Sequence, residues 1–354
     1  MSEKVLLGLS GGVDSAIAAY FLKKQGYDVT CCFMRNWDSI ANNDIKGNPT
    51  LTGSKCSQEL DYDDAKKTAD ELGLPLLRKD FIEEYWKEVF SMFLSTYKKG
   101  YTPDPDVFCN KYIKFGHFYD YAKSLGFNTI AMGHYAKRIS EEQLSHALFP
   151  LSDITKPEVR KIASNLNLTV AKKKDSTGVC FIGERNFKNF LSNYLPSKPG
   201  KIVDIVTRKV LEDHDGILYY TVGQHRGMNI GGIKGRTCDP FFVVGKDVNK
   251  NILYVAQEKG NDYRLSSRCL IDGFNWIGND IPTSSYDCNC KFRYRGKDMP
   301  VKLTIIDNHS AYLSYDNYSY VAKGQIACLY EGSRLVGSGI IEKTYDKNYK
   351  EINY

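Results

Sequence analysis

The order of apolar and amphipathic segments in the first half of the chain restricts the fold most strongly. From residue 4 to about residue 195, short apolar runs alternate with stretches of helical periodicity. Residues 5–9 (VLLGL) and 29–33 (VTCCF) have the length and composition of buried strands, and a helix is predicted between them from about Asp14 to Gly26. This alternation is typical of a doubly wound, mostly parallel sheet with helices around it, so the first half is predicted to be an α/β domain.

Further helices are predicted along this half. Residues 61–72 begin with acidic residues and are followed by Gly73, as helix-dipole and C-cap preferences favour. The next helix should bury a stripe that we interpret as core rather than as a cofactor-binding face: Ile82, Tyr85, Trp86, Val89, Phe90, Phe93, Leu94 and Tyr97. Thr155 and Glu158 have the spacing of a capping box. The helix that follows them should bury Val159, Ile162, Ala163 and Leu166.

Strand patterns dominate beyond residue 195. Residues 195–201 (LPSKPGK) contain two prolines and a glycine, so the helix before them cannot continue and the main domain boundary is placed there. Strands are predicted at residues 218–222, 241–245, 252–256, 291–294, 301–305, 326–330 and 335–341. With a second division near residues 264–268, the chain is expected to have three domains: residues 1–195, a small mainly β middle module at 196–265, and a C-terminal β-barrel at 266–354.

Composition excludes several classes of protein. No apolar run approaches the roughly 18 residues that a membrane-spanning helix needs, and charged residues make up 25% of the chain. The first residues resemble neither a secretory signal nor an organelle presequence, so a cytoplasmic protein is expected. Ten cysteines in 354 residues, with no CxxC pair, fall short of a disulfide scaffold or a zinc ribbon. The net charge of +6 is compatible with a polyanionic partner.

Residues 10–15 (SGGVDS) form a motif directly after the first predicted strand and directly before a helix. Gly11 and Gly12 allow the backbone to approach a ligand, and the start of a helix presents unpaired N–H groups to an anion. We therefore interpret the motif as a phosphate-binding loop. It is not a Walker A loop, because no GxxxxGK[ST] sequence occurs, and its glycine spacing differs from GxGxxG. The alternative is a glycine turn in which Ser10 caps the helix.

SGGVDS resembles the loop of the N-type ATP pyrophosphatases, which split ATP into AMP and pyrophosphate to adenylate a substrate. Longer segments resemble the tRNA-specific 2-thiouridylase (MnmA) family over nearly the whole chain: residues 104–110 (DPDVFCN), 133–135 (GHY), 172–185 (KKKDSTGVCFIGER) and 194–200 (YLPSKPG). This resemblance implies ATP-dependent 2-thiolation of the wobble uridine of tRNA by a sulfurtransferase. It also implies that residues 1–195 form an ATP-pyrophosphatase catalytic domain with the adenine nucleotide alpha hydrolase-like fold.

The implied chemistry needs two thiols. The C2 carbonyl of uracil is a poor electrophile, but adenylation converts its oxygen into part of an AMP leaving group. A cysteine persulfide can then deliver sulfur, and a second thiol can release that sulfur by forming a disulfide with the carrier. The resemblance assigns the nucleophile to Cys109 and the persulfide carrier to Cys180, with a transient disulfide between them. It places Asp106 beside the target base as an acid or base. The sulfur is expected from a persulfide donor protein or a cysteine desulfurase relay.

The two catalytic cysteines have polar neighbours in the sequence, a setting that suits a reactive thiolate. Four others lie in apolar, strand-like stretches and are interpreted as small buried hydrophobic residues: Cys31, Cys32, Cys269 and Cys328. Cys288 and Cys290 form a CxC pair on one face of a probable strand, and we identify no partner residues that would complete a metal site with them. The role of Cys56 is left open.

The resemblance also assigns the nucleotide-binding positions: Gly8, Leu9, Ser10, Gly11, Gly12, Val13, Asp14, Ser15, Met34 and Gly133. Met34 ends the second predicted strand, and open α/β sheets bind ligands at the carboxyl ends of their strands. Mg²⁺ is expected to bind through the phosphates of ATP, because no dedicated metal cage is recognisable in the sequence.

Several residues are expected to contact tRNA. The target base is assigned to Asp104, Pro105 and Asp106. Phosphate contacts are expected from Lys172, Lys173 and Lys174, although a lysine run is also typical of a solvated face. The resemblance adds Arg293 and Tyr294, whose cation and ring suit stacking on a nucleotide. Strand alternation is a competing explanation for that segment, and weaker candidates are His225 and Arg226.

Two departures from the family pattern are present. After residues 133–138 (GHYAKR), the family continues through a tRNA-contacting segment that contains KDQSYFL, and that segment is missing here. Asp104 replaces an Asn of the family and adds negative charge beside the expected uridine site. Two other functions remain open. One is an adenylating synthetase that uses ammonia, for which Cys180 would be dispensable. The other is an inactive protein that only binds RNA or a nucleotide.

Overall fold

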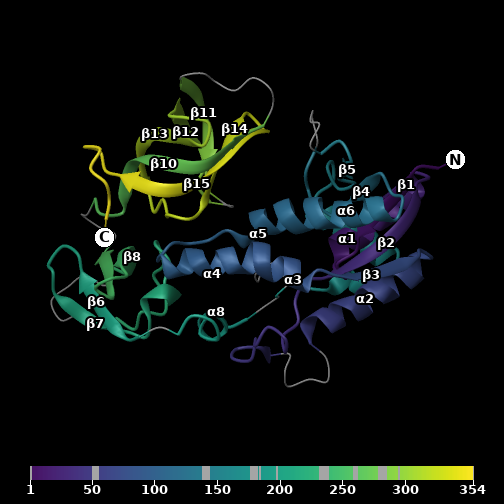
Figure 1. Ribbon diagram of the computed structural model, residues 1–354, viewed down its shortest axis with the longest axis horizontal. Helices are drawn as coiled ribbons and strands as arrows, with labels where there is room; N and C mark the ends of the chain where they lie inside the picture. Colours follow the sequence, from purple (N-terminus) through teal and green to yellow (C-terminus); the bar gives the residue numbers. More distant parts are fainter. Residues whose placement is uncertain are drawn as a thin grey trace. The chain divides into compact units, whose positions relative to one another are not determined.

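The computed structural model describes residues 2–49, 56–137, 144–175, 182, 185–196, 198–230, 239–257, 262–277, 285–293 and 296–353 (Figure 1). The chain divides into two compact units. The first consists of Met1–Met92 and Pro105–Asn193, and the second of Phe93–Asp104 and Tyr194–Tyr354. Each unit has a hydrophobic core of its own.

A five-stranded parallel sheet forms the centre of the first unit, with the strand order β3-β2-β1-β4-β5. Its strands are β1 (Lys4–Gly8), β2 (Asp28–Arg35), β3 (Leu76–Asp80), β4 (Thr129–Ala131) and β5 (Ala147–Leu148). Four consecutive residues of β1 are buried, as expected for a central strand that is covered on both faces. The strands predicted at residues 5–9 and 29–33 and the predicted α/β fold class are confirmed.

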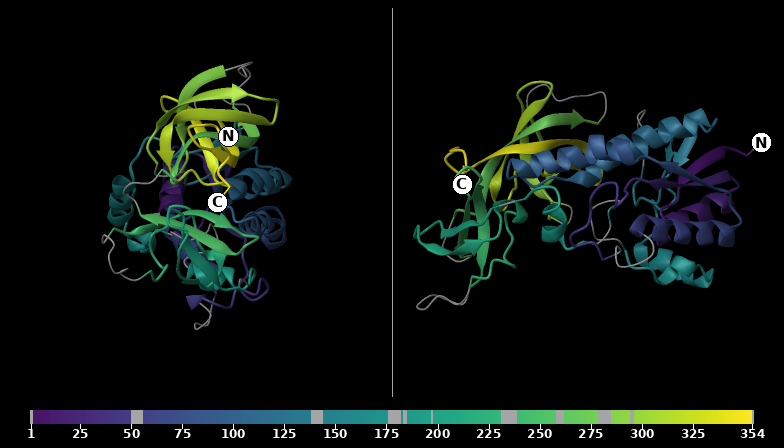
Figure 2. Two further views of the ribbon diagram at one scale, coloured as in Figure 1. Left: turned by 90° about the vertical axis from the view of Figure 1, so that its left-hand side faces the viewer. Right: turned by 60° about the horizontal axis from the view of Figure 1, so that its bottom comes forward.

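Helices surround this sheet, as the two views of Figure 2 show. The helices of the first unit are α1 (Val13–Lys24), α2 (Ser57–Leu72), α3 (Ile82–Tyr85), α5 (Pro105–Phe108), α6 (Phe118–Ser124), α7 (Lys156–Asn165) and α8 (Phe187–Leu191). A further helix, α4 (Ser91–Lys98), lies mostly in the second unit. Two π-helical segments, η2 (Trp86–Phe90) and η3 (Cys109–His117), and a 3-10 turn, η4 (Thr169–Lys172), complete the set. On one face of the sheet, α1, α2 and α7 share a core with β1 and β2.

Most residues of the two predicted helix faces are buried, three are partly buried (Ile82, Leu94 and Ile162), and two are exposed. In the aromatic stripe, the residues that are at least 95% buried are Tyr85, Val89, Phe90, Phe93 and Tyr97. Trp86 is 37% exposed, because η2 is wound more widely than an α-helix and the steps of three and four lose register there. Leu166 was also predicted to be buried. It is 36% exposed because it is the C-cap of α7 and lies beyond the last turn.

Two β structures make up most of the second unit. A four-stranded sheet has the order β7-β6-β9-β8, and a closed barrel has the order β10-β13-β12-β11-β14-β15. The sheet strands are β6 (Gly200–Asp204), β7 (Val210–His214), β8 (Phe241–Asp247) and β9 (Ile252–Gln257). The barrel strands are β10 (Leu265–Trp276), β11 (Ser285–Lys291), β12 (Met299–Ile305), β13 (Ser310–Ser319), β14 (Ile326–Glu331) and β15 (Arg334–Tyr345). The predicted middle module and C-terminal barrel are confirmed, whereas the exact domain boundaries stay predictions.

Two predicted strands are wrong. Residues 218–222 do not form a strand, because the 3-10 turn η5 (Ile217–Tyr219) begins the segment and Lys246 Nζ donates a hydrogen bond to Tyr220 O at 2.8 Å. A side chain therefore satisfies a carbonyl that a neighbouring strand would have paired. Of the described residues 291–293, only Lys291 is in β11, and Phe292 lies beyond its end. Within the described ranges, every helix is too short or too polar to cross a bilayer.

Candidate active site

The phosphate loop, residues 10–15, connects the end of β1 to the start of α1. Gly11 has a φ of +74°, and a Cβ atom there would lie 2.2 Å from Asp61 O, so the position requires glycine. Ser15 Oγ accepts a hydrogen bond from Ser10 N (3.1 Å) and donates one to Gly12 O (3.0 Å). Gly12, not Ser10, is the N-cap of α1, and it supplies no side-chain cap. This geometry leaves the start of α1 suited to an anion.

Three expected nucleotide-binding residues from neighbouring strands lie together at one edge of the sheet. Gly8 ends β1, Met34 lies near the end of β2, and Gly133 follows β4. A Cβ atom on Gly8 would lie 2.9 Å from Met34 Cε, and one on Gly133 would lie 2.8 Å from Ser15 N. Because the strands are parallel, their carboxyl ends share the edge at which open α/β sheets bind ligands.

Asp14, in the first turn of α1, is held by side chains from two other segments. Tyr135 Oη donates to Asp14 Oδ1 at 2.6 Å, and Lys156 Nζ donates to the two carboxylate oxygens at 2.8 and 2.6 Å. Burial, reinforced by the hydrogen bond to Asp14, raises the pKa of Tyr135, so its hydroxyl stays protonated at neutral pH. Neither Tyr135 nor Lys156 was predicted as a site residue. The signal for Tyr135 was its place in the GHY motif.

Lys173 is the member of the predicted lysine run that reaches the phosphate loop. Its Nζ donates to Gly11 O at 3.0 Å and to the carboxylates of Asp61 and Asp64 at 2.7 Å each. Burial opposes the charge of Lys173, but the two carboxylates outweigh burial and raise its pKa. The other two members of the run are exposed: Lys172 and Lys174. The run is therefore divided between the loop and a solvated face.

Cys109 lies about one turn into a continuous helical run formed by α5, η3 and α6. Its side chain is fully buried, which differs from the open, polar setting expected from its sequence neighbours. Pro105 begins the run, a position at which its missing N–H costs no helical hydrogen bond. Asp106, in the first turn, is exposed. The two residues therefore have opposite solvent exposure although they are three positions apart.

Asn110, next to Cys109, links this helical run to the sheet. Its Oδ1 accepts a hydrogen bond from Lys114 Nζ at 2.9 Å and lies 3.3 Å from His134 Nε2, which can donate to it as the N–H tautomer. Burial, together with the charge of Lys114, lowers the pKa of His134 to about 4, so the imidazole is neutral at pH 7. Because His134 follows Gly133, this contact connects the Cys109 helix to the edge that carries the phosphate loop. No role was predicted from the sequence for His134 or Asn110.

Cys180 lies outside the described residues, so its pairing with Cys109 stays a prediction. Five positions before it, Asp175 accepts from Lys156 Nζ and Arg160 Nη2 at 2.8 Å each. Partial burial opposes ionisation of Asp175, but the bonds from these two cations prevail and lower its pKa. Five positions after Cys180, Arg185 forms an ion pair with the buried Asp44 at 3.0 Å. The described residues on both sides of Cys180 are therefore fixed to the first unit.

The residues predicted to contact the target base are divided between the units. Asp104 is the last residue of the second unit before Pro105 and Asp106 continue into the first. Burial, with the nearby charge of Asp104, raises the pKa of the partly buried Cys328 to about 11. Two weaker candidates for RNA contact are exposed: His225 and Arg226.

Arg293 lies after the end of β11, so strand alternation, the competing explanation for this segment, does not apply to it. Its Nη2 donates to Val222 O at 3.1 Å and to Tyr320 O at 2.5 Å, and burial lowers its pKa. Part of the guanidinium is thus committed to contacts within the second unit. Tyr294 lies outside the described residues, and its role stays a prediction.

The remaining cysteines have structural settings. Cys31, Cys32 and Cys269 are fully buried, and burial raises the pKa of each thiol to about 12, which confirms them as small hydrophobic residues. Cys328, which was predicted to be buried with them, is only partly buried. Cys290 is buried in the barrel core and Cys288 is partly buried against it, so the two lie on one face of β11, as predicted from their spacing. Across the described ranges, no three His, Cys, Asp or Glu side chains are grouped so that they could hold a metal ion.

Family models match three successive parts of the chain. The model described as "tRNA methyl transferase HUP domain" matches residues 3–142 and 137–184. The "tRNA methyl transferase PRC-barrel domain" matches residues 188–257, and the "Aminomethyltransferase beta-barrel domain" matches residues 266–341. The first match has two pieces that meet at residues 137–142, which is where the sequence lacks the expected segment containing KDQSYFL.

Curated relatives match almost the whole chain. The "tRNA-specific 2-thiouridylase MnmA" of Metamycoplasma arthritidis (strain 158L3-1) is 47% identical over 373 residues, which covers 99% of both chains. The protein of the same name from Mycoplasmopsis pulmonis (strain UAB CTIP) is 42% identical and also covers 99% of both chains. That from Mycoplasma capricolum subsp. capricolum is 46% identical and covers 97% of this chain and 99% of its own. An alignment of 373 positions on a chain of 354 residues leaves at least 19 positions of the first relative without a counterpart here.

Proposed function

Because this chain belongs to the tRNA-specific 2-thiouridylase (MnmA) family and is therefore a tRNA sulfurtransferase, we propose that it replaces O2 of the wobble uridine with sulfur at the expense of ATP. The observation that carries this proposal is the connection of three features in the first unit. The phosphate loop contacts Gly133, His134 follows it, and His134 faces Asn110 beside Cys109. A site for nucleotide phosphates and a candidate nucleophile are thus joined by two short contacts.

The first step is activation of the uridine. The phosphates of ATP would bind at the glycine turn and the start of α1, where Gly11 and Gly12 leave room for the ligand. Uridine O2 attacks the α-phosphorus, pyrophosphate leaves, and AMP is joined to O2 as a leaving group. Lys173, bonded to Gly11 O, would supply positive charge close to the departing phosphates. Mg²⁺ would arrive on the nucleotide and neutralise part of the phosphate charge.

The second step is sulfur transfer from a persulfide on Cys180. The Cys109 thiolate attacks Sγ of Cys180, the sulfur–sulfur bond of the persulfide breaks, and a Cys109–Cys180 disulfide forms. The terminal sulfur leaves as hydrosulfide, attacks C2 of the activated uridine and displaces AMP. A thiol reductant must then supply two electrons to reopen the disulfide, and a persulfide donor protein must reload Cys180. Asp106, exposed one turn before Cys109, would accept or donate the proton at the target base.

The experiment combines the purified chain with unmodified tRNA, ATP and a persulfide donor. We expect pyrophosphate release together with 2-thiouridine, which mass spectrometry of the digested tRNA detects as sulfur in place of oxygen. Cys180→Ser should still release pyrophosphate and form no thiouridine. If Cys180→Ser makes as much modified product as the parent chain, the persulfide mechanism is wrong. A methyl group in place of sulfur in the product would contradict the function itself.

A further inference from the structure

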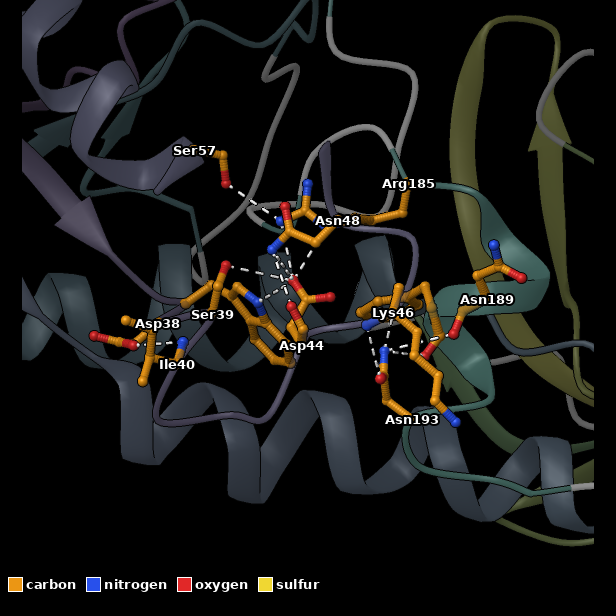
Figure 3. A network of polar contacts seen from close by, with 12 residues as sticks. Asp38, Ser39, Ile40, Asp44, Lys46, Asn48, Ser57, Arg185, Asn189 and Asn193 are labelled. Atoms are coloured by element: carbon orange, nitrogen blue, oxygen red, sulfur yellow. Dashed lines mark hydrogen bonds and ion pairs between the residues drawn. The ribbon is translucent and has the colours of Figure 1, made fainter. Parts of the chain in front are cut away.

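A buried carboxylate lies in the segment between β2 and α2. Asp44 is fully buried, and its Oδ2 accepts hydrogen bonds from Trp37 Nε1 at 3.1 Å and Asn48 Nδ2 at 3.2 Å (Figure 3). The same oxygen accepts from Arg185 Nε and Nη2, each at 3.0 Å. The side chain of Arg185 is only 4% exposed. Residues more than 130 positions apart in the chain thus share one enclosed ion pair.

The ion pair between Asp44 and Arg185 is expected to orient the Arg185 side chain more than it stabilises the folded chain. A buried ion pair contributes little compared with apolar side chains of the same volume, because both charges lose their hydration. The two guanidinium nitrogens that point at one oxygen instead fix the angle at which Arg185 approaches. We therefore expect that the main effect of Asp44 is to fix the position of the backbone at Arg185.

Neighbouring contacts hold the chain after Arg185 in the same place. Lys46 N donates to Asn193 Oδ1 at 3.0 Å, and Asn193 Nδ2 donates back to Lys46 O at 3.2 Å. A Cβ atom on Gly47 would lie 2.6 Å from Asn189 Cβ, so α8 packs directly on the backbone of residue 47. Residues 44–48 and 185–193 therefore form one docked pair of segments, which Figure 3 shows with Asp44 and Arg185 at one end and Asn193 at the other.

The contact between residues 44–48 and 185–193 can affect Cys180 only through the short length of chain between Cys180 and Arg185. Cys180 is five residues from Asp175 and five from Arg185 in the sequence, and five fully extended residues span at most about 18 Å. Asp175 is held by Lys156 and Arg160, and Arg185 is held by Asp44. Both tethers belong to the unit that contains Cys109. A segment that is anchored at both ends samples a smaller volume than one anchored at a single end, so the loss of one anchor lowers the effective concentration of a group that the segment carries.

From these contacts, we propose that Asp44 and Arg185 are positioning residues for sulfur transfer, because their ion pair fixes the chain from which Cys180 acts. This inference rests on the proposed function, in which Cys180 carries the persulfide. It assigns a role in the second step only. Activation of the uridine depends on the phosphate loop, which is built from other residues.

The test separates the two steps in the full chain with tRNA, ATP and a persulfide donor. In Asp44→Asn, which keeps the shape and removes the charge, we expect thiouridine formed per pyrophosphate released to fall at least about tenfold, since small misplacements of reacting groups have effects of this size. The first-turnover rate of pyrophosphate release should stay within about threefold of the parent. Mass mapping should find that the Cys109–Cys180 disulfide forms more slowly.

Two further variants make the result decisive. Asp153→Asn removes an exposed ion pair of the same unit, with Lys137 at 2.7 Å, and should leave both steps unchanged. Arg185→Lys keeps the charge and loses the two-nitrogen geometry, so it should show an intermediate loss, and it replaces Asp44→Asn if that variant does not fold. If pyrophosphate release and thiolation fall together in the folded variant, or if their ratio is unchanged, the positioning role is overturned. A parent chain that releases pyrophosphate without thiolation would instead overturn the proposed function.

Discussion

At the scale of single residues, the phosphate loop depends on the absence of one side chain. Gly11→Ala should weaken the binding of ATP at least about tenfold, because the new Cβ atom would lie 2.2 Å from Asp61 O and move the loop or α2. The strained backbone at φ +74° should cost a further ~1–2 kcal/mol of unfolding free energy. Calorimetric titration with ATP and urea denaturation measure the two effects.

Gly26 provides the matched control for this loop. Its φ is +89°, but a Cβ atom there would have no neighbour within 4 Å. Gly26→Ala should therefore lose the same ~1–2 kcal/mol of stability and keep its affinity for ATP. Equal loss of affinity in the two variants would show that the contact with Asp61 is not the cause.

The lowered pKa of His134 predicts how the free energy of unfolding depends on pH. Its pKa is about 4 in the folded chain and about 6.5 when unfolded, so folding favours the neutral ring. The stabilisation that the neutral ring provides is fully present above pH 6.5 and is lost as the pH falls toward 4. The free energy of unfolding should therefore fall by about 2 kcal/mol between pH 7.5 and pH 5. The advantage of the parent chain over His134→Gln in unfolding free energy should shrink by that amount over this interval.

Urea unfolding of both proteins at the two pH values checks this expectation. The same substitution at the exposed His225, His225→Gln, is the control for the change of residue type. If the difference between the parent and His134→Gln is the same at pH 7.5 and pH 5, the ring is not held neutral by the fold.

At the scale of elements, α7 supplies two of the cations that organise the site. Lys156 and Arg160 lie in its first two turns and hold Asp14 and Asp175. The helix starts at the predicted capping box, in which Thr155 N and Oγ1 both donate to a carboxylate oxygen of Glu158, at 2.8 and 2.6 Å. The start of α7, and with it the placement of Lys156, is therefore encoded locally.

Thr155→Ala should reduce the unfolding free energy by about 1 kcal/mol, the usual contribution of an N-cap hydroxyl. Thr155→Ser keeps the hydroxyl and should lose only a few tenths of that amount. Urea denaturation of the three proteins measures the effect. Equal losses in the Ala and Ser variants would mean that the methyl group, not the cap, stabilises α7.

At the scale of the whole molecule, the two units should respond separately to damage in their cores. Leu313 in the barrel and Ile17 in the α/β unit are both fully buried, so replacement of either by alanine should cost about 2–5 kcal/mol. A non-hydrolysable ATP analogue at 100 times its Kd should stabilise the α/β unit by about 2.7 kcal/mol. Scanning calorimetry should show that Leu313→Ala lowers a transition that the analogue does not shift. Ile17→Ala should instead lower the temperature of the unfolding transition that the ATP analogue shifts. A single transition lowered by both variants would contradict this independence.

Much of the fold could be predicted because its signals are local. The strands at residues 5–9 and 29–33, the hairpin of β8 and β9, and the capping box of α7 each depend on residues close together in the sequence. Errors occurred where a distant partner decided the outcome. Residues 218–222 have the composition of a strand, but Lys246 takes a carbonyl that a ladder would have used. The strand β10 was missed, and its partners in the barrel, β13 and β15, lie far from it in the sequence.

The candidate site shows the same difference between features that depend on neighbouring residues and features that depend on distant ones. By itself, the sequence determined the phosphate loop, because the glycines and the strand and helix around them lie within one short segment, and it determined the family. Only the tertiary structure decided which side chains surround that loop. Lys173 reaches Gly11, Lys156 and Tyr135 reach Asp14, His134 faces Asn110, and Asp44 holds Arg185. These pairs are distant in sequence, and a charged or polar side chain meets such a partner only when the fold brings the two segments together, so no local pattern records them.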